Sequence, residues 1–307
     1  MMIFDSAAIS KVNIADITDN ELFKVSKNIF QVTLPASLKL SGMLEVPYIF
    51  KKDKGYNILT CHNRIKILRE AGITHLECFV LDHPDAAIFM NHVSLKTYRN
   101  ELGSFGKLKT LSLLSSAFNL NESERKEFCT KVLKLASEFI DNEAYLKKIM
   151  DFPDTLISYI DEKDISFKII KDLSLLPAEW IAVVSRWIND IQIRVNIFRM
   201  LIDYLFDIYR RGDSISVIEA VISGDDKTLY DNIYRIRYPE YSKLKMKSDS
   251  IINELSGAGL TIEFPEYFDR RSLTLKIDID KKSDCANQLK KVSKIDIDKL
   301  TELLSLL

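Results

Sequence analysis

The sequence predicts an α+β protein built from three consecutive parts. Its 307 residues are too many for one ordinary hydrophobic core, so two or three domains are expected. The spacing of hydrophobic residues also changes twice along the chain. Residues 1–95 mix strand and helix patterns, residues 96–255 have helical spacing, and residues 256–307 combine an alternating hairpin pattern with a final helix.

The first part contains a hairpin, a helix and a further strand. Tyr48-Ile49-Phe50 and Tyr56-Asn57-Ile58-Leu59 are strand-like runs, and the polar residues 51–55 between them supply a turn. Residues 63–71 carry apolar side chains at helical spacing, and residues 76–81 have another strand pattern. This alternation predicts an α/β domain over residues 1–95.

The second part has the helical period almost throughout. Short polar links join its helices, which is typical of a compact helical bundle, and no fixed-period repeat is present. The expected helices cover residues 123–139, 142–150, 165–176, 180–188 and 197–209.

The third part begins at a glycine-containing hinge near residues 256–259. Residues 260–264 and 273–279 alternate between apolar and polar side chains, and residues 269–272 between them can turn, so a β-hairpin is expected. A final helix follows at about residues 298–306. The chain is therefore expected to end in a small β-α module.

The composition, 47% hydrophobic and 28% charged residues, is ordinary for a soluble globular protein. A formal net charge of -1 gives no overall attraction to nucleic acid, although DNA binding needs only a local basic patch. The four cysteines form no CxxC pair and no zinc-ligand spacing with histidine, so no metal site is expected. Without a signal peptide or an uncharged apolar span, we expect a cytoplasmic protein with free thiols and no membrane partner.

Two segments of the first part resemble the ParB family. Residues 36–49 look like the family stretch in which a serine-led helix ends at a glycine and a proline opens the next strand. Residues 56–68 stand where ParB proteins carry Tyr-x-x-(Ile/Val)-x-Gly-Glu-Arg-Arg-x-Arg-Ala. Arg64 matches the second arginine of this box, and Lys66 replaces the last one. The resemblance covers about residues 8–100 and implies the fold of the ParB/sulfiredoxin superfamily.

The resemblance implies a nucleotide pocket at the turn that leads into the helix near Asn63. In the family this turn cradles the triphosphate of CTP, since free N–H groups at a helix N-terminus and an arginine attract phosphate. Here Cys61, His62 and Asn63 replace the glycine, the glutamate and the first arginine of the box. The implied ligand is CTP with Mg²⁺, and the implied activity is at most a slow CTPase. The candidate nucleotide-binding residues are Thr60, Cys61, His62, Asn63, Arg64, Lys66 and Asn91.

Three other interpretations of the pocket remain open. Arg64 could simply brace the fold through a carboxylate, with His62 capping the helix, in a scaffold protein whose pocket has decayed. Sulfiredoxin, on the same fold, has a catalytic cysteine in this turn, and Cys61 lies one residue before the matching position. A nucleotide-using phosphotransferase would need a carboxylate base, for which Glu45 is the candidate.

The helical part resembles the DNA-binding region of ParB proteins. In the family a helix-turn-helix is followed by a run Leu-Leu-x-Leu-Pro, and residues 145–153 resemble that run. Residues 121–135 would then be the supporting helix. Residues 142–150 would be the recognition helix, whose exposed polar side chains read base edges in the major groove. The candidate DNA contacts are Asn142, Tyr145, Lys147 and Lys148.

A second basic region, residues 227–247, interleaves tyrosines with basic side chains. Such a mixture can stack on bases and neutralise phosphates, which adds Arg235 and Arg237 to the DNA-binding candidates. The tyrosines at 230, 234, 238 and 241 fall on one helix face, however. We therefore favour packing of these rings inside the protein, with the basic face in water.

The resemblance implies a ParB-like DNA-binding protein that acts in plasmid or chromosome partition or related DNA maintenance. The expected partners are DNA, a second copy of the chain and a ParA-type ATPase, and the expected location is the cytoplasm, at the nucleoid or a plasmid. The strand at residues 273–279 and the final helix look like the dimerising module that ends many ParB proteins. That helix has an apolar face made of Leu300, Leu303, Leu304 and Leu307. Alternatively, this face only covers the hairpin of its own chain.

Overall fold

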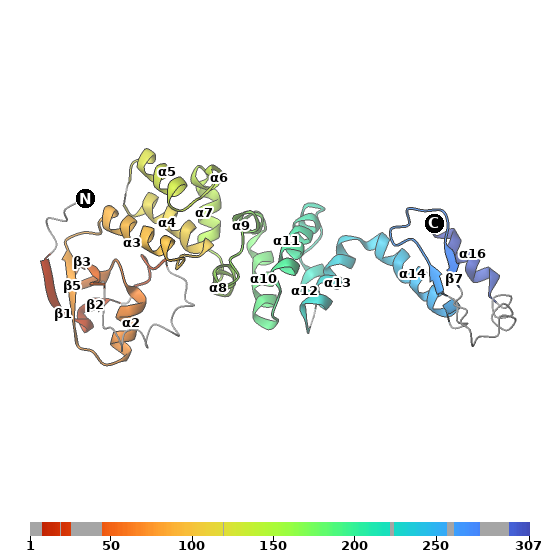
Figure 1. Ribbon diagram of the computed structural model, residues 1–307, viewed down its shortest axis with the longest axis horizontal. Helices are drawn as coiled ribbons and strands as arrows, with labels where there is room; N and C mark the ends of the chain where they lie inside the picture. The colour runs from red at the N-terminus through yellow and green to blue at the C-terminus, as the bar shows by residue number, and fades with distance from the viewer. Residues whose placement is uncertain are drawn as a thin grey trace, which may run out of the picture.

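The protein is elongated, with a sheet at its N-terminal end, helices along its middle and a small hairpin module at its C-terminal end (Figure 1). This order confirms the predicted α+β class. The computed structural model describes residues 8–18, 20–25, 45–118, 120–221, 224–256, 261–276 and 295–307. The predictions that fall on residues 36–44, 257–260, 277–279 and Cys285 lie outside the described residues.

The N-terminal sheet has five strands in the order β1-β5-β3-β4-β2. They are β1 (Ala8–Asn13), β2 (Ile17–Thr18), β3 (Tyr48–Lys52), β4 (Gly55–Ile58) and β5 (His75–Leu81). Strands β3 and β4 form the predicted antiparallel hairpin, in which Ile49 lies opposite Ile58. Strand β5 pairs with β3 in parallel and with β1 antiparallel, and β2 pairs with β4 in parallel.

Successive residues of β3 point into two different hydrophobic cores, as the period of two in a strand requires. Ile49 joins a core with Ile58 and with Ile65 of helix α2 (His62–Glu70). Phe50 points to the other face and joins a larger core with Phe89 of helix α3 (Ala86–Tyr98). That larger core continues without interruption into the helical part of the molecule. The sheet is therefore fixed to the helices that follow it.

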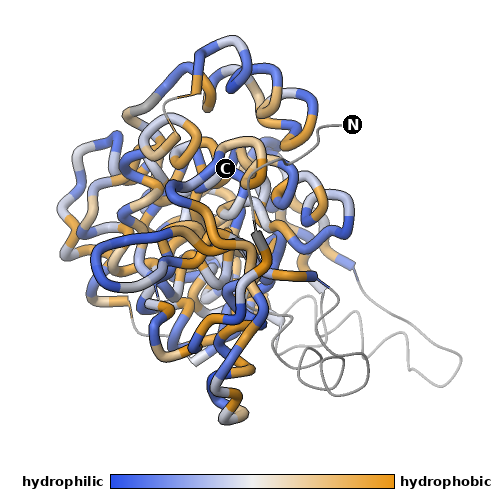
Figure 2. Tube along the Cα trace, turned by 90° about the vertical axis from the view of Figure 1, so that its left-hand side faces the viewer, coloured by the Kyte–Doolittle hydropathy of each residue, from blue (hydrophilic) through white to orange (hydrophobic). Residues whose placement is uncertain are grey.

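The middle of the chain consists of short helices, and those before residue 238 share this core. They are α4 (Ser104–Ser116), α5 (Glu122–Lys131), α6 (Ser137–Ile140), α7 (Glu143–Met150), α8 (Asp154–Glu162), α9 (Phe167–Leu175), α10 (Ala178–Asp190), α11 (Val195–Arg210), α12 (Ser216–Glu219), α13 (Asp226–Arg237) and α14 (Pro239–Ser256). Hydrophobic and hydrophilic stretches alternate along the chain in the end-on view of Figure 2, as amphipathic elements require.

One helix prediction in this region was wrong. The sequence predicted a single helix over residues 123–139, but the structure has two, α5 and α6, separated at Lys134. Lys134 has φ 58°, in the left-handed region, so the helix cannot continue through it. Leu133 and Leu135 on either side are buried. Anchoring both leucines in the core accounts for the break.

The C-terminal module consists of the end of α14, the antiparallel pair β6 (Thr261–Glu263) and β7 (Thr274–Lys276), and helix α16 (Ile297–Ser305). Among the described residues, Phe264 and Leu273, which were predicted as strand, lie just outside the two strands. A separate small core joins Ile251 and Leu255 of α14 to Ile262 of β6 and Leu303 of α16. No helix among the described residues combines the length and apolarity that crossing a membrane requires.

Candidate functional site

The turn from β4 into α2 is held in an unusual backbone conformation. Thr60 is buried, and its Oγ1 accepts a hydrogen bond of 2.9 Å from the backbone N–H of Tyr48, which ties the turn to β3. Cys61 is the N-cap of α2 and has φ 65° and ψ 26°, in the left-handed region. Glycine adopts this region freely, whereas other L-residues do so at a cost of about 1–2 kcal/mol. The cysteine thus keeps a backbone that suits a glycine.

Three charged side chains meet beside this turn. Arg64 of α2 donates through Nη1 to Glu45 Oε2 at 2.7 Å, and Arg99, which follows α3, donates through Nη1 to Glu45 Oε1 at 2.5 Å. Burial alone would raise the pKa of Glu45. The hydrogen bond from Arg99 and the charge of Arg64 outweigh that effect, so the pKa lies below its ordinary value. The carboxylate is therefore a weak base, which does not favour a role as the base of a phosphotransferase.

A pocket of about 320 Å³ lies next to this cluster. Tyr48 and Phe79 line it with rings stacked at a centroid distance of 4.7 Å, and other apolar side chains extend this wall. The structure brings three of the predicted nucleotide-binding residues to the pocket, namely Thr60, Cys61 and Asn91. The remaining lining residues are Glu45, Val46, Ile88, His92 and Leu95. The pocket therefore combines a flat apolar wall with hydroxyl, amide and imidazole groups.

Cys61 does not have the surroundings of a reactive thiol. Burial raises the pKa of its Sγ, and the charge of Arg64 offsets that effect only in part. The Sγ atom lies 3.9 Å from Arg64 Nη1 and 4.0 Å from Glu45 Oε2. A reactive cysteine needs a lowered pKa and access to its substrate. The geometry therefore does not favour the sulfiredoxin-like chemistry.

Two histidines near the pocket are neutral at physiological pH. Burial lowers the pKa of His62 to about 3, with a smaller contribution from His92, and burial together with Lys96 lowers that of His92 to about 3. His62 is the first residue of α2 rather than its cap. Its Nε2 and the Oδ1 of Asn63 are buried and have no hydrogen-bond partner among the described residues. Buried polar atoms of this kind need a water molecule or a polar ligand as a partner.

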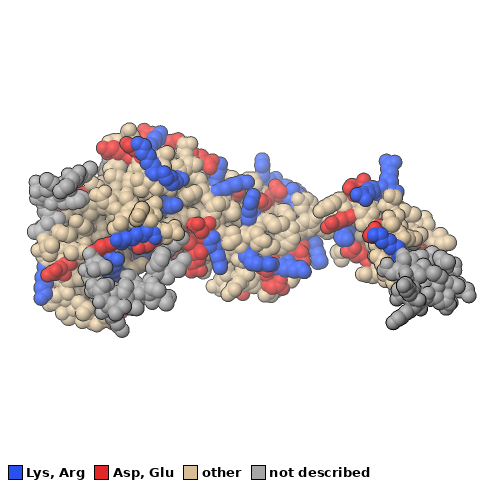
Figure 3. Space-filling model, in the orientation of Figure 1, with Lys and Arg blue, Asp and Glu red and all other residues tan. Residues whose placement is uncertain are grey.

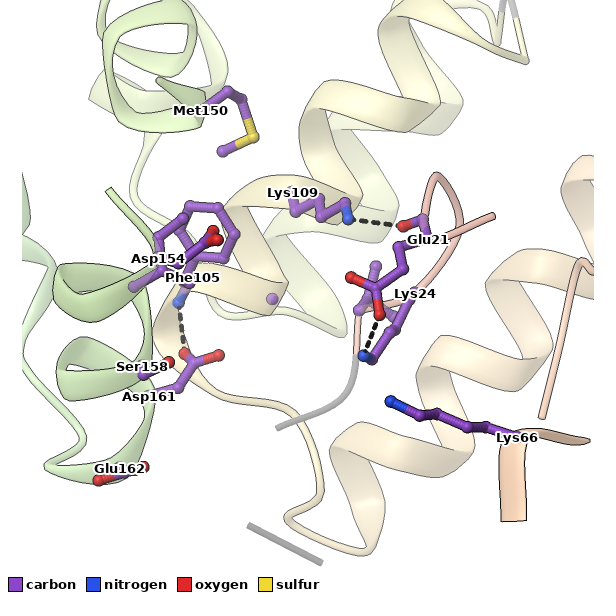
Figure 4. A pocket seen from close by; sticks show the side chains of 13 residues that line it. Glu21, Lys24, Lys66, Phe105, Lys109, Met150, Asp154, Ser158, Asp161 and Glu162 are labelled. Atoms are coloured by element: carbon purple, nitrogen blue, oxygen red, sulfur yellow. Dashed lines mark hydrogen bonds and ion pairs between the residues drawn. The ribbon is translucent and has the colours of Figure 1, made fainter. Parts of the chain in front are cut away.

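Lys66 does not join this pocket but lines a larger cleft of about 620 Å³ between the sheet and the helices (Figure 4). One wall carries Lys24, Lys66 and Lys109, and Glu21 accepts hydrogen bonds from Lys24 and Lys109. The opposite wall, on α8, carries Asp154, Asp161 and Glu162. Asp161 also accepts a hydrogen bond from the backbone N–H of Phe105. The two walls are thus of opposite charge.

Gly106 of α4 sets the width of this cleft. A Cβ atom at Gly106 would lie 2.2 Å from the backbone oxygen of Val25. Only glycine therefore lets the segment of residues 20–25 pack against α4 and bring Lys24 towards Lys109. No group of three or more His, Cys, Asp or Glu side chains within the described ranges is arranged to hold a metal ion.

The predicted recognition helix corresponds to α7, but its candidate residues differ in exposure. Asn142 is the N-cap, and its Oδ1 accepts a hydrogen bond from the backbone N–H of Tyr145. Tyr145 is half-buried, with the ammonium of Lys171 over its ring. Lys147 and Lys148 point into solvent. Only the two lysines are therefore freely placed to contact a nucleic acid.

The second basic region forms part of α13 and α14, and its tyrosines pack on one another. The rings of Tyr230, Tyr234, Tyr238 and Tyr241 form a row, with Tyr204 of α11 packed against the first three. The rings therefore pack on one another as favoured, but Tyr238 is exposed and lies at the C-cap of α13 rather than on a single continuous helix. Arg235 is exposed, whereas Arg237 pairs with Asp207 at 2.8 Å and stacks on Tyr238. On the face seen in Figure 3, basic and acidic side chains are interspersed.

The sequence patterns do not identify several residues that the structure places at these two sites. They are Arg99 and His92 at the pocket and Lys24 and Lys109 at the cleft. Arg99 and Lys109 do stand in a basic stretch of the sequence. Their partners Glu45 and Glu21 lie 54 and 88 residues earlier, however, so the contacts exist only in the folded chain.

Comparisons with known proteins give matches among solved structures alone, since neither a family model nor a curated protein matches the chain. The chain is similar to C-terminally truncated ParB from Caulobacter crescentus complexed with CTP-gamma-S, with 14% identity, 59% of this chain and 99% of that chain covered, and a TM-score of 0.26. For the same ParB complexed with the centromeric parS site, the identity is 14%, 63% of this chain and 98% of that chain are covered, and the TM-score is 0.31. For a Pnob8-like ParB-N domain, the identity is 11%, 79% of this chain and 97% of that chain are covered, and the TM-score is 0.40.

All three similarities are to ParB proteins.

Proposed function

We propose that this chain is a ParB-like DNA-binding protein whose N-terminal pocket binds a nucleotide, with CTP as the first candidate. The observation that carries the proposal is the convergence of Arg64 and Arg99 beside the pocket at the start of α2. Two guanidinium groups and the free N–H groups of a helix N-terminus together form a site for the phosphates of a nucleotide. Mg²⁺ would be carried mainly by those phosphates, as is usual for nucleotide sites.

The rest of the pocket suits the base and the sugar. A flat heterocycle can lie against the Tyr48–Phe79 wall, while Thr60, Asn91 and His92 offer hydrogen-bonding groups around it. The chain's own residues would thus hold the phosphates at one end and the base at the other. A bound nucleotide could also give partners to the orphaned His62 and Asn63 atoms.

For DNA, we propose that the exposed face of α7 makes the first contacts, through Lys147 and Lys148. Arg235 on α13 is a second exposed cation. Ammonium and guanidinium groups neutralise backbone phosphates, which supplies most of the sequence-independent affinity. A role in plasmid or chromosome partition, with a ParA-type ATPase as a partner, is part of the same proposal.

We also propose that two copies associate through the C-terminal module. Among the described residues of the module, its core contains four buried side chains, Ile251, Leu255, Ile262 and Leu303. A two-stranded hairpin with so small a core is marginally stable alone. Leu275 and Leu304 remain exposed on the same module and offer apolar surface to a second copy.

Isothermal titration of the purified chain with CTP, ATP, GTP and UTP, each with Mg²⁺, tests the nucleotide site. We expect selective binding that Arg64→Ala abolishes. Lys51→Ala is the matched control, because Lys51 is an exposed cation of the same domain, paired with Asp82 outside the pocket. Binding that is equal in both variants would place the nucleotide elsewhere, and no binding by the wild-type chain would leave a constitutive DNA-binding protein.

A further inference from the structure

The Glu45 carboxylate occupies the position between Arg64 and Arg99 where a bound anion would lie. Each of its two oxygens accepts a hydrogen bond from a different guanidinium, at 2.7 and 2.5 Å. The three side chains come from separate elements, since Glu45 precedes β3, Arg64 lies on α2 and Arg99 follows α3. A carboxylate oxygen and a phosphate oxygen accept the same charge-assisted hydrogen bonds from arginine.

The side chains of Glu45, Arg64 and Arg99 are all partly exposed, which allows an anion from solvent to replace the Glu45 carboxylate. The Glu45 side chain is 26% exposed and that of Arg99 is 42% exposed, so neither is locked inside the protein. Glu45 also lines the neighbouring pocket, so a ligand seated there would meet its carboxylate. An ion pair with this much exposure is worth little on its own, and a polyphosphate carries more negative charge than the carboxylate that it would replace.

We propose that Glu45 acts as a built-in competitor, whose carboxylate fills the anion site until the phosphates of a nucleotide displace it from Arg64 and Arg99. This inference rests on the proposed nucleotide site and specifies how that site is regulated. We call the two ion pairs of Glu45 with Arg64 and Arg99 the clasp, which is open when both pairs are broken. Because the ligand binds only the open form, the measured affinity is the intrinsic affinity multiplied by the fraction of molecules whose clasp is open. The same displacement would release Glu45, ahead of β3, from its contacts with α2 and with the end of α3.

Inorganic tripolyphosphate tests the clasp without a base. We expect Glu45→Gln, which keeps the shape but removes the charge, to bind tripolyphosphate roughly tenfold more tightly than the wild-type chain if the clasp is closed in about nine molecules of ten. Glu77→Gln is the matched control, because Glu77 is an exposed carboxylate on β5 that does not line the pocket. The gain should disappear when Arg64→Ala or Arg99→Ala is added to Glu45→Gln.

Thermal unfolding separates this role from simple bracing. If Glu45 only braces the fold, Glu45→Gln lowers Tm and tripolyphosphate does not restore it. If Glu45 stands in for an anion, tripolyphosphate raises the Tm of the variant more than that of the wild-type chain. Should Glu45→Gln fold poorly, Glu45→Asp supplies the second variant, because its shorter side chain cannot span both arginines and should give a smaller gain in affinity.

The outcomes distinguish the clasp from the nucleotide site. Equal gains in Glu45→Gln and Glu77→Gln would overturn the clasp, since they would reflect general charge alone. CTP binding by the wild-type chain that Glu45→Gln leaves unchanged would also overturn it, while keeping the nucleotide site. Tripolyphosphate binding that needs both arginines and rises in Glu45→Gln, without binding of any nucleotide, would support the clasp and reject the nucleotide proposal.

Discussion

At the scale of single residues, Cys61 departs from ordinary backbone geometry. It adopts a left-handed conformation at the N-cap of α2 while its thiol is buried. The position thus combines a conformational cost with a packing contribution. Replacing the cysteine with alanine or with glycine removes the same thiol, but only glycine removes the strain.

We therefore expect Cys61→Gly to be more stable than Cys61→Ala by about 1 kcal/mol. The comparison is made between the two variants rather than with the wild-type chain, because both lack the buried Sγ. Urea unfolding followed by circular dichroism measures the difference. Equal stabilities would mean that the turn relaxes to an unstrained backbone when the thiol is absent.

His62 and His92 make stability depend on pH at the residue scale. The pKa of each is lowered to about 3 in the fold from an ordinary 6.5. Between these values the unfolded chain binds more protons, so the contribution is fully present above pH 6.5 and is lost as pH falls towards 3. At pH 5 we expect a loss of up to about 2 kcal/mol for each histidine.

Urea unfolding at pH 7.5 and pH 5 measures this loss, and His92→Asn should reduce it. Glu45 interferes little in this window, because its lowered pKa puts its own titration at more acidic pH. His83→Asn is the control, since His83 is exposed. A pH dependence that is unchanged in His92→Asn would show that this ring titrates normally.

At the scale of elements, helix α7 is the element to which we assign the proposed DNA contacts. Its polar face carries Lys147 and Lys148 in solvent, while Leu146 and Ile149 are buried and hold the helix in the core. The lysines can therefore be replaced without disturbing the packing of the helix.

Replacing Lys147 and Lys148 with alanine should weaken DNA binding. The slope of log affinity against log salt should also become shallower, by about one unit for each lysine that neutralises a phosphate in the wild-type complex. Fluorescence anisotropy with a labelled duplex at several salt concentrations measures both quantities. Lys163→Ala, at the exposed C-cap of the neighbouring α8, is the control. If the control reduces the slope equally, α7 has no special role in binding.

The elements also mark the limit of what the sequence could predict. The β3–β4 hairpin followed from alternation and a polar turn, and the position of Arg64 followed from one motif next to a helix start. The Arg99–Glu45 pair did not, because 54 residues separate its members and no local pattern encodes their meeting. The break at Lys134 was also hidden, since Leu133 and Leu135 continue a plausible helical pattern and only their joint burial demands the turn.

At the scale of the whole molecule, two hydrophobic cores of very unequal size stand at the ends of α14. The large core extends from the sheet to α13, and the small one lies in the C-terminal module. Within the small module, Leu303 of α16 is fully buried whereas the next residue, Leu304, is 43% exposed. Leu304 thus offers a way to perturb association without emptying the core.

Leu304→Lys should convert a dimer into a monomer while the helical part stays folded, because the substitution puts a charge on the exposed apolar face of α16. Size-exclusion chromatography with light scattering measures the mass, and circular dichroism checks the fold. Ser305→Lys adds the same charge to the same helix at an exposed polar position that does not share the face of Leu304, and it should leave the mass unchanged. A monomeric wild-type chain would rule out association through this surface.

Helix α14 has 18 residues, so at 1.5 Å per residue it is about 27 Å long. Its buried residues Ser248, Ile251 and Leu255 all lie in its second half, while Tyr241 in the first half packs against Tyr234 of α13 and Phe268 of the C-terminal module. Proline at its first position gives the helix a defined starting direction after Tyr238. If two copies joined at their C-terminal modules, the distance between their two N-terminal pockets would depend on the angle between the two α14 helices. A change of a few degrees in that angle would move the N-terminal ends by many ångströms.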